Sequence, residues 1–148
     1  MGYTSEVYLH GSRNFMEELN GYFDFLNEKE LAKLAKKFPD ESFEDVDCRK
    51  EVFSLFEMAN ERHNFNGEIV YIWRRIKWYA DADIAIILLM DFLKNYASPR
   101  DFRFGRFGEY EQDVEEYGER SYGYYSVRKE FRCEVNPMFF AEVFHSNK

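Results

Sequence analysis

The side chains that most often carry out chemistry are few and scattered in this chain. The three histidines, His10, His63 and His145, fall at the end of an expected strand, in a turn and in the C-terminal tail. None of them has a Ser, Cys or carboxylate at the spacing of a catalytic triad or a metal site. We therefore interpret the histidines as structural, and we expect no catalytic residue and no bound metal.

Three further features could carry chemistry. The run Gly105–Gly108 lacks the strand-to-helix setting and the Lys of a phosphate-binding loop. Glu109 and Asp113 are close enough in sequence to form a carboxylate pair, although an exposed acidic loop is the favoured interpretation. Cys48 and Cys133 lie far apart and form no C-x-x-C pair, which indicates neither a zinc site nor a disulfide framework. The sequence thus predicts a protein that is not an enzyme and uses no cofactor.

Acidic side chains are the most conspicuous polar feature. The formal net charge of −8 argues against loose attachment to nucleic acid or to anionic lipid, because both need a basic surface. Two stretches, 40–47 and 109–119, are rich in carboxylates and would present negative charge to a basic groove, with solubility as the alternative role. The candidate partner-binding residues are those of the second stretch: Glu109, Glu111, Asp113, Glu115, Glu116 and Glu119.

The stretch 67–96 predicts the elements around which the fold is organised. Residues 68–79 alternate with a period of two and are rich in β-branched and aromatic side chains, which predicts a strand. We expect one face of this strand to meet the helices and the other to be open. Residues from Asp81 or Asp83 onward then form a helix to about Tyr96, since either Asp is a suitable N-cap. The expected inward residues are Val70, Ile72, Ile76 and Trp78, and the expected outward residues are Tyr71, Trp73, Arg75, Lys77 and Tyr79.

The remaining elements follow from periodicity and from turn residues. Residues 51–60 fit either a helix face or a buried strand, and the turn signal at 64–67 favours a strand that forms a hairpin with 68–79. Residues 40–47 predict a solvated loop, and residues 109–119 a short helix or a loop. The other expected elements are strands at 3–10, 101–107 and 122–135, helices at 13–25 and 28–38, and a helical turn in the tail 138–148.

In this order the elements predict an α+β fold for a single domain of residues 1–148. The expected core is a split β-α-β-β-α-β unit: one antiparallel sheet of about five strands, with the helices packed mainly on one face. The longest apolar stretch, 84–90, is far shorter than the ~20 residues that span a bilayer, and no targeting segment precedes it. We therefore expect a cytoplasmic protein without a membrane partner.

The open face of that sheet provides an alternative ligand site. Aromatic rings interleaved with cations form a platform on which a base can stack while its phosphate is neutralised. Ordinary cross-strand pairs on a wet surface are the competing interpretation. The residues expected on this face are Tyr8, Tyr71, Trp73, Arg75, Lys77, Tyr124, Arg128 and Arg132.

Three short motifs, taken together, carry a family resemblance. They are Met1-Gly2-Tyr3 at the start, Lys77-Trp78-Tyr79 before the central helix, and Arg106-Phe107-Gly108-Glu109 followed by Asp113-Val114-Glu115. In order and spacing these resemble small, uncharacterised proteins of tailed bacteriophages, apart from a longer segment at 40–49. The resemblance implies a phage origin and an α+β fold, and it implies no activity.

A small, acidic, phage-like chain without a catalytic constellation is expected to act by binding. Our leading hypothesis is an inhibitor of a host or anti-phage defence protein, of the anti-CRISPR or another anti-defence kind, acting in the host cytoplasm through an acidic surface that mimics nucleic acid. The alternative is a nucleotide or single-stranded nucleic-acid binder that uses the open face of the sheet. The sequence indicates neither the identity of the target nor the oligomeric state.

Overall fold

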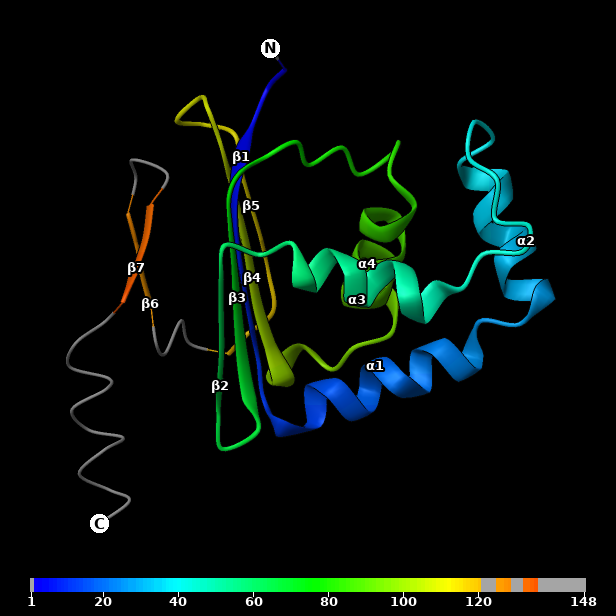
Figure 1. Cartoon of the computed structure of the whole chain (residues 1–148), viewed down its shortest axis with the longest axis horizontal. Coiled ribbons are helices and arrows are strands. Elements are labelled where there is room, and N and C mark those ends of the chain that lie inside the picture. The colour runs from blue at the N-terminus through cyan, green and yellow to red at the C-terminus, as the bar shows by residue number, and fades with distance from the viewer. Residues whose placement is uncertain (1, 121–124, 129–131, 136–148) are drawn as a thin grey trace.

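A five-stranded antiparallel sheet carries helices on one of its faces (Figure 1). The computed structural model describes residues 2–120 in full and the backbone of residues 125–128 and 132–135. The elements are β1 (Ser5–Gly11), α1 (Arg13–Phe25), α2 (Glu28–Lys37), α3 (Cys48–Glu57), β2 (Glu61–Phe65), β3 (Glu68–Ile76), α4 (Ile84–Asn95), the 3-10 helix η1 (Pro99–Asp101), β4 (Phe102–Gly108), β5 (Val114–Tyr117), β6 (Tyr125–Arg128) and β7 (Arg132–Val135).

The strand order is β2-β3-β1-β4-β5, and every neighbouring pair is antiparallel. β1 to β4 with the intervening helices form the predicted split β-α-β-β-α-β unit, to which β5 is added at one edge. The predicted fold class, α+β with a single sheet of five strands, is therefore confirmed. β6 and β7 form a separate hairpin on the side of the sheet away from the helices, where Cα atoms of β7 lie within 8 Å of Cα atoms of β1 (Figure 1).

The strand predicted at 51–60 is wrong, because this segment belongs to the helix α3. The Asp47 side chain accepts a hydrogen bond from the Lys50 N–H at 3.1 Å, which caps the helix start. Val52, Leu55 and Phe56 are buried together at helical spacing. The hairpin partner of β3 is instead β2, and the pair turns through Asn66 and Gly67, which both have positive φ, as the tightest hairpin turns require.

Two further predicted elements also differ from the structure. The acidic stretch 109–119 contains the edge strand β5, which pairs with β4, rather than a helix or a loop alone. The long strand predicted at 122–135 is divided into the two short strands β6 and β7. The tail 138–148 lies outside the described residues.

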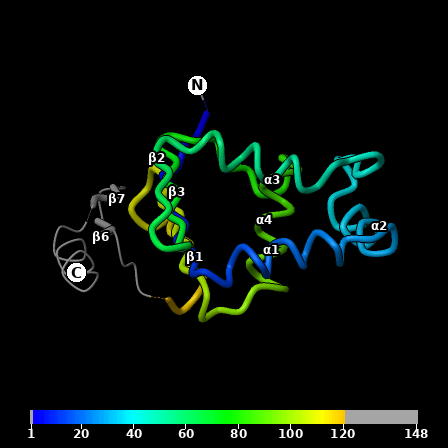
Figure 2. Tube along the Cα trace, turned by 60° about the horizontal axis from the view of Figure 1, so that its bottom comes forward, coloured from blue at the N-terminus to red at the C-terminus, as the bar shows by residue number. Residues whose placement is uncertain are grey.

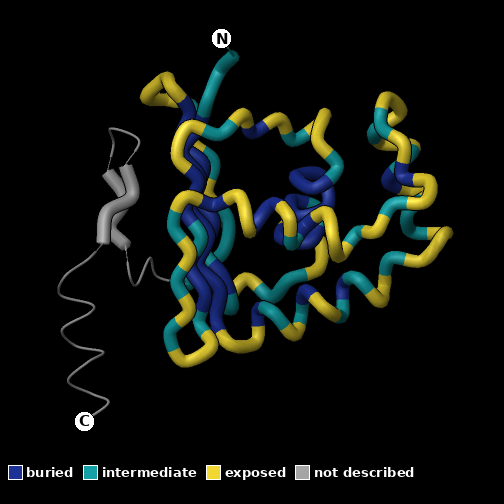
Figure 3. The backbone as a smooth tube through the Cα atoms, viewed as in Figure 1, coloured by how far each residue is buried: buried dark blue, intermediate teal, exposed yellow. Residues whose placement is uncertain are grey.

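The core lies between the sheet and the helices α1, α3 and α4 (Figure 3). α4 is the most buried helix of the described chain, and its side chains from Ala85 to Met90 are all inaccessible to solvent or nearly so. Aromatic rings fill the layer in which it packs: Phe92 meets Phe15 with ring centroids 5.4 Å apart, and Trp73 meets Trp78 at 5.6 Å. Many of the aromatic residues that the structure describes thus build this layer.

α2 and the loop 38–47 extend beyond the helical layer, at the end of the molecule farthest from the sheet (Figure 2). The Asn27 side chain caps α2 by accepting from the Glu30 N–H at 3.0 Å. Only Leu34 of α2 and Phe43 of the loop are buried. The loop predicted at 40–47 is confirmed, since it contains neither helix nor strand.

Leu88 of α4 is fully buried, so truncating its side chain tests the assignment of this core directly. Leu88→Ala should lower the free energy of unfolding by about 2–5 kcal/mol, because it removes buried methyl groups and leaves a cavity. Met58→Ala is the matched control, since Met58 is 66% exposed and its truncation should change stability by less than about 0.5 kcal/mol. Urea denaturation of both variants measures the difference, and equal midpoints would contradict the core assignment.

Candidate functional site

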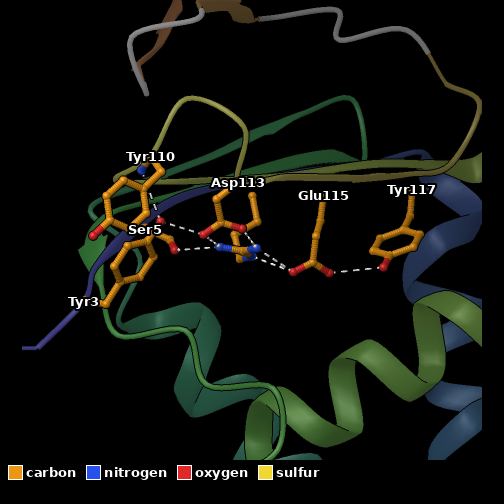
Figure 4. Close-up of polar contacts among 7 residues, drawn as sticks. Tyr3, Ser5, Tyr110, Asp113, Glu115 and Tyr117 are labelled. Carbon is orange, nitrogen blue, oxygen red and sulfur yellow. Dashed lines mark hydrogen bonds and ion pairs between the residues drawn. The ribbon is translucent and has the colours of Figure 1, made fainter.

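The densest polar network that the structure describes surrounds Arg106 of β4, which lies opposite the core residue Val7 of β1 and so shares the face of the sheet towards the helices. Figure 4 shows its partners Ser5, Asp113 and Glu115 on this face. Its guanidinium donates to both carboxylate oxygens of Asp113, with Nη2–Oδ1 at 2.5 Å and Nη1–Oδ2 at 3.1 Å. It also donates to Glu115 Oε1 at 2.7 Å and to Ser5 Oγ at 3.1 Å. Arg106 is only 8% exposed, so this set of partners offsets the cost of burying its charge.

Strand pairing explains why these groups meet. Arg106 lies opposite Glu115 in the β4–β5 register, so the two side chains share a face. Asp113 lies just before β5, where its carbonyl accepts from the Gly108 N–H at 2.8 Å. A Cβ on Gly108 would lie 2.1 Å from the Asp113 carboxylate and 2.2 Å from the Tyr3 hydroxyl, so only glycine fits here.

The same network displaces the pKa values of its members. Hydrogen bonds from Arg106, and next from Tyr3, lower the pKa of Asp113 to about 2. The hydrogen bond to Asp113 likewise raises the pKa of Arg106 above its usual value. Desolvation is the main reason that the pKa of Tyr3 is raised, followed by its hydrogen bond to Asp113. Asp113 and Arg106 therefore stay charged at any physiological pH.

The network holds an exposed turn, residues 109–113, in one conformation. The Tyr3 hydroxyl donates to Asp113 Oδ2 at 2.6 Å and accepts from the Tyr110 N–H at 3.2 Å. The rings of Tyr3 and Tyr110 lie with centroids 5.6 Å apart, and Tyr110 is 70% exposed. Gly2, the residue before Tyr3, lies against Tyr79: a Cβ on Gly2 would be 2.8 Å from the Tyr79 hydroxyl oxygen.

We call the surface formed by Tyr3, Tyr79 and Tyr110 the tyrosine tip. It lies at the end of the sheet where β1 begins and where β3 and β4 end. Lys77, Glu109 and Glu111 are exposed beside these rings and make a rim of mixed charge. The tip thus combines exposed aromatic surface with polar groups on a turn whose Asp113 is hydrogen-bonded to Tyr3 and Arg106.

The predicted acidic site is only partly exposed to a partner. Asp113 and Glu115 are bound to Arg106, and Glu116 forms an ion pair with Arg103 at 3.2 Å. Glu109, Glu111 and Glu119 are exposed and form no ion pair with the residues that the structure describes. Of the six predicted partner-binding carboxylates, three are therefore paired with strand arginines, and three are exposed without an ion pair among the described residues.

The open aromatic face expected on the sheet is also wrong. Trp73 is 1% exposed, and its Nε1 donates to the Leu55 carbonyl of α3 at 2.8 Å. Tyr71 stacks on Phe56 with ring centroids 4.5 Å apart, so it also faces the helices. Tyr8 is fully buried and lies on the opposite face, across from Ile72.

An extra residue in β3 explains this error. Ser5 pairs with Ile76 but Val7 pairs with Trp73, so two steps along β1 oppose three along β3. The bulge contains Arg75, which has a φ of 57°, and it reverses the alternation. Ile76 and Trp78 therefore face the helices, as expected, whereas Val70 and Ile72 lie on the other face. Arg75 and Lys77 are exposed, while Tyr124 and the side chains of Arg128 and Arg132 lie outside the described residues.

Each histidine that the structure describes lies beside a carboxylate. His10 is buried with its Nε2 at 3.3 Å from Glu68 Oε1, and His63 Nε2 lies 3.6 Å from Glu61 Oε1. Cys48 is a half-buried free thiol. No three His, Cys, Asp or Glu side chains gather as a metal-binding set within residues 2–120. His145 and the side chain of Cys133 lie outside the described residues.

Sequence reasoning missed the residues that organise the site, namely Tyr3, Ser5, Arg106 and Tyr110. Arg106 belongs to the motif Arg106-Phe107-Gly108-Glu109, and a cation on the same face of the strand as Phe102 and Phe104 would have been a usable signal. No signal within the sequence links Tyr3 to Asp113, because 110 residues separate them.

Comparison with known proteins leaves the family open. No protein-family model, no curated protein and no solved structure matches this chain. None of the helices within the described residues has the length and apolarity needed to span a lipid bilayer. The inference about function therefore rests on the geometry of the chain itself.

Loss of the charge on Asp113 should destabilise the protein in a pH-dependent way. We expect Asp113→Asn to cost about 1–2 kcal/mol at neutral pH, since Arg106 loses a bidentate partner. The folded pKa of Asp113 is depressed, so this contribution is fully present above about pH 4 and is lost as the pH falls towards 2. The stability gap between wild type and variant should therefore narrow below about pH 4.

Urea denaturation at several pH values measures that gap. Glu111→Gln is the matched control, because Glu111 is an exposed carboxylate in the same turn. A gap that is equally large for both variants, or one that stays constant down to about pH 2.5, would contradict the role assigned to Asp113.

Proposed function

We propose that this chain is a non-enzymatic binding protein that contacts another protein through the tyrosine tip. The observation that carries the proposal is Tyr110, a large aromatic side chain that is 70% exposed on a turn held in place by Tyr3, Asp113 and Arg106. A tyrosine ring offers a large contact area at a small cost in conformational entropy, and tyrosines are enriched among the residues that dominate binding energy.

Preorganisation supports the same proposal. The backbone of the turn is fixed by hydrogen bonds from the Gly108 N–H to the Asp113 carbonyl and from the Asp113 N–H to the Tyr110 carbonyl, at 2.8 and 3.0 Å. A surface that is already ordered loses less entropy on binding than a flexible loop. The bidentate Arg106–Asp113 contact then serves the tip by holding its shape, and Gly108 allows the close approach that this contact needs.

Charge indicates the kind of partner. The net charge of −8, with Glu109 and Glu111 exposed on either side of Tyr110, favours a partner whose surface is basic around an aromatic-binding pocket. Together with the phage-like motifs, this supports an inhibitor of a host or anti-phage defence protein that normally binds nucleic acid, acting in the host cytoplasm. Imitation of a nucleic acid would come from these two carboxylates, because Asp113 and Glu115 are bound to Arg106.

Capture of partners from host lysate, followed by binding measurements with the purified partner, tests the proposal. Tyr110→Ala should weaken binding by about 2 kcal/mol, or roughly 30-fold, because it removes the central exposed ring. Its melting temperature should stay close to that of wild type, since the ring is mostly in solvent.

Tyr96→Ala is the control for this measurement. Tyr96 is 41% exposed, but it lies at the end of α4 against Phe25 and Tyr22 of α1, away from the tip. The Tyr96→Ala variant should therefore retain full affinity for the partner. A partner that binds Tyr110→Ala as tightly as wild type would show that the tip is not the contact surface.

The two exposed carboxylates beside Tyr110, Glu109 and Glu111, should act mainly on the rate of association with the partner. Glu109→Gln with Glu111→Gln should slow association about 3–10-fold at low salt and leave dissociation nearly unchanged, because exposed charges steer encounter and are screened over ~10 Å at 0.1 M salt. Asp40→Asn with Glu44→Gln makes the same change in net charge on the remote loop 38–47. Equal effects of the two double variants in stopped-flow kinetics would mean that net charge alone matters.

A further inference from the structure

The face of the sheet away from the helices, which we call the outer face, is apolar at its centre. Four of its side chains, Tyr8, Val70, Ile72 and Phe107, are at most 6% exposed, yet they lie outside the core cluster beneath the helices. Strand pairing brings them together: Tyr8 lies opposite Ile72, and Glu6, two positions before Tyr8, lies opposite Phe107. Pairing alone leaves the face of a sheet open, so another part of the chain covers these four side chains.

Ion pairs frame this apolar centre. On one side, Arg74 of β3 binds Glu6 of β1 at 2.6 Å and Glu61 of β2 at 2.5 Å. On the other side, Arg103 of β4 binds Glu116 of β5 at 3.2 Å. An apolar centre with a polar rim is the usual anatomy of a protein interface. Each of these charges has a partner within the sheet itself, and it keeps that partner if the cover of the centre is removed.

The chain passes onto the outer face at Arg120, just beyond β5. The Arg120 N–H donates to the Phe102 carbonyl of β4 at 3.2 Å, and its guanidinium donates to Glu68 of β3. Because β1 lies between β4 and β3, the Arg120 side chain crosses over β1. Glu68 also lies 3.3 Å from Nε2 of His10, two positions after Tyr8 on the same face. The chain is thus directed over the outer face, where β7 lies with Cα atoms within 8 Å of those of β1.

The register of β6 and β7 divides their hairpin into an apolar and a polar face. Paired residues, and residues two apart along a strand, fall on the same face. One face receives the pairs Tyr125–Val135 and Val127–Cys133, and the other receives Ser126–Glu134 and Arg128–Arg132. A two-stranded hairpin by itself is at best marginally stable in water, so it needs an apolar surface against its apolar face.

We propose that the outer face of the sheet is the docking surface for the β6–β7 hairpin of the same chain, with the apolar face of the hairpin against the apolar centre. Among the described residues no strand ladder joins the hairpin to the five-stranded sheet. The two are therefore held together by side-chain contacts, and the hairpin detaches as one unit while the sheet and helices stay folded. The inference is independent of the proposed function.

Cys133 of β7 reports whether the hairpin is docked. Cys48 is the other of the two cysteines, so Cys48→Ser leaves a single thiol in the full chain. In this background a water-soluble maleimide should label Cys133 at least about 100-fold more slowly than in the urea-unfolded chain. The urea dependence of labelling should be smaller than that of global unfolding, which the fluorescence of Trp73 and Trp78 follows, because detachment exposes less surface.

Two neighbouring substitutions in the same background test which face docks. Val127→Lys places a charge on the apolar face, so Cys133 should be labelled about 100-fold faster than in Ser126→Lys, since a docked state would bury that charge without a partner. Ser126→Lys is the matched control, because it adds the same charge on the polar face, opposite Glu134. Both variants should keep the tryptophan fluorescence of the folded chain.

Several results would overturn the proposal. Rapid labelling of Cys133 without either lysine, or equal labelling of the two variants, would show that the apolar face of the hairpin is not docked. Loss of the folded tryptophan signal in Val127→Lys, or one urea dependence for labelling and global unfolding, would show that the hairpin does not detach separately. A dimer in analytical ultracentrifugation, with protection of Cys133 that rises with protein concentration, would assign the covering hairpin to a second copy of the chain.

Discussion

Burial of β1 on both faces is the constraint on which the rest of the structure depends. All seven residues of this central strand are buried, and it pairs with β3 on one side and β4 on the other. A strand in this position must pair its polar side chains, since a buried charge without a partner costs several kcal/mol. The pairs are present: Glu6 accepts from Arg74 at 2.6 Å, and Ser5 accepts from Arg106 at 3.1 Å.

The candidate site follows from this constraint. Arg106 lies in the sheet beside β1, where its charge needs carboxylate partners. Asp113, just before β5, and Glu115 of β5 provide them. Those carboxylates in turn determine the conformation of the turn between β4 and β5. One structural requirement of the sheet thus places Tyr110 on an exposed turn. The residues that shape the turn are therefore the same ones that satisfy a buried charge.

The helical layer is joined to the sheet by a few polar contacts at its periphery. Trp73 donates to the backbone of α3, and Tyr22 of α1 donates to Asp91 of α4 at 2.6 Å. Near the crossing from β1 to α1, Glu18 accepts from the Ser98 N–H at 3.1 Å, and Asp101 accepts from the Ser12 hydroxyl at 2.9 Å. The interior between these contacts is almost entirely apolar.

The sequence by itself determined the order of most elements and the fold class. Alternation located β1 and most of β3, helical spacing located α1, α2 and α4, and the pair Asn66-Gly67 located the hairpin turn. These signals are local, since each depends on residues a few positions apart. The split β-α-β-β-α-β topology then followed from the order of elements and the handedness of their connections.

Only the tertiary structure decided which face of β3 meets the helices, whether 51–60 is helix or strand, and which carboxylates remain exposed. Period-two alternation cannot distinguish two faces that are both buried, and the bulge at Arg75 reverses it part of the way along the strand. The apolar run of α3 fits two periodicities and becomes a helix where Tyr71 and Trp73 pack against it. The tyrosine tip depends on Tyr3 reaching Asp113 across 110 residues, and pairing at that distance is set by how the strands assemble.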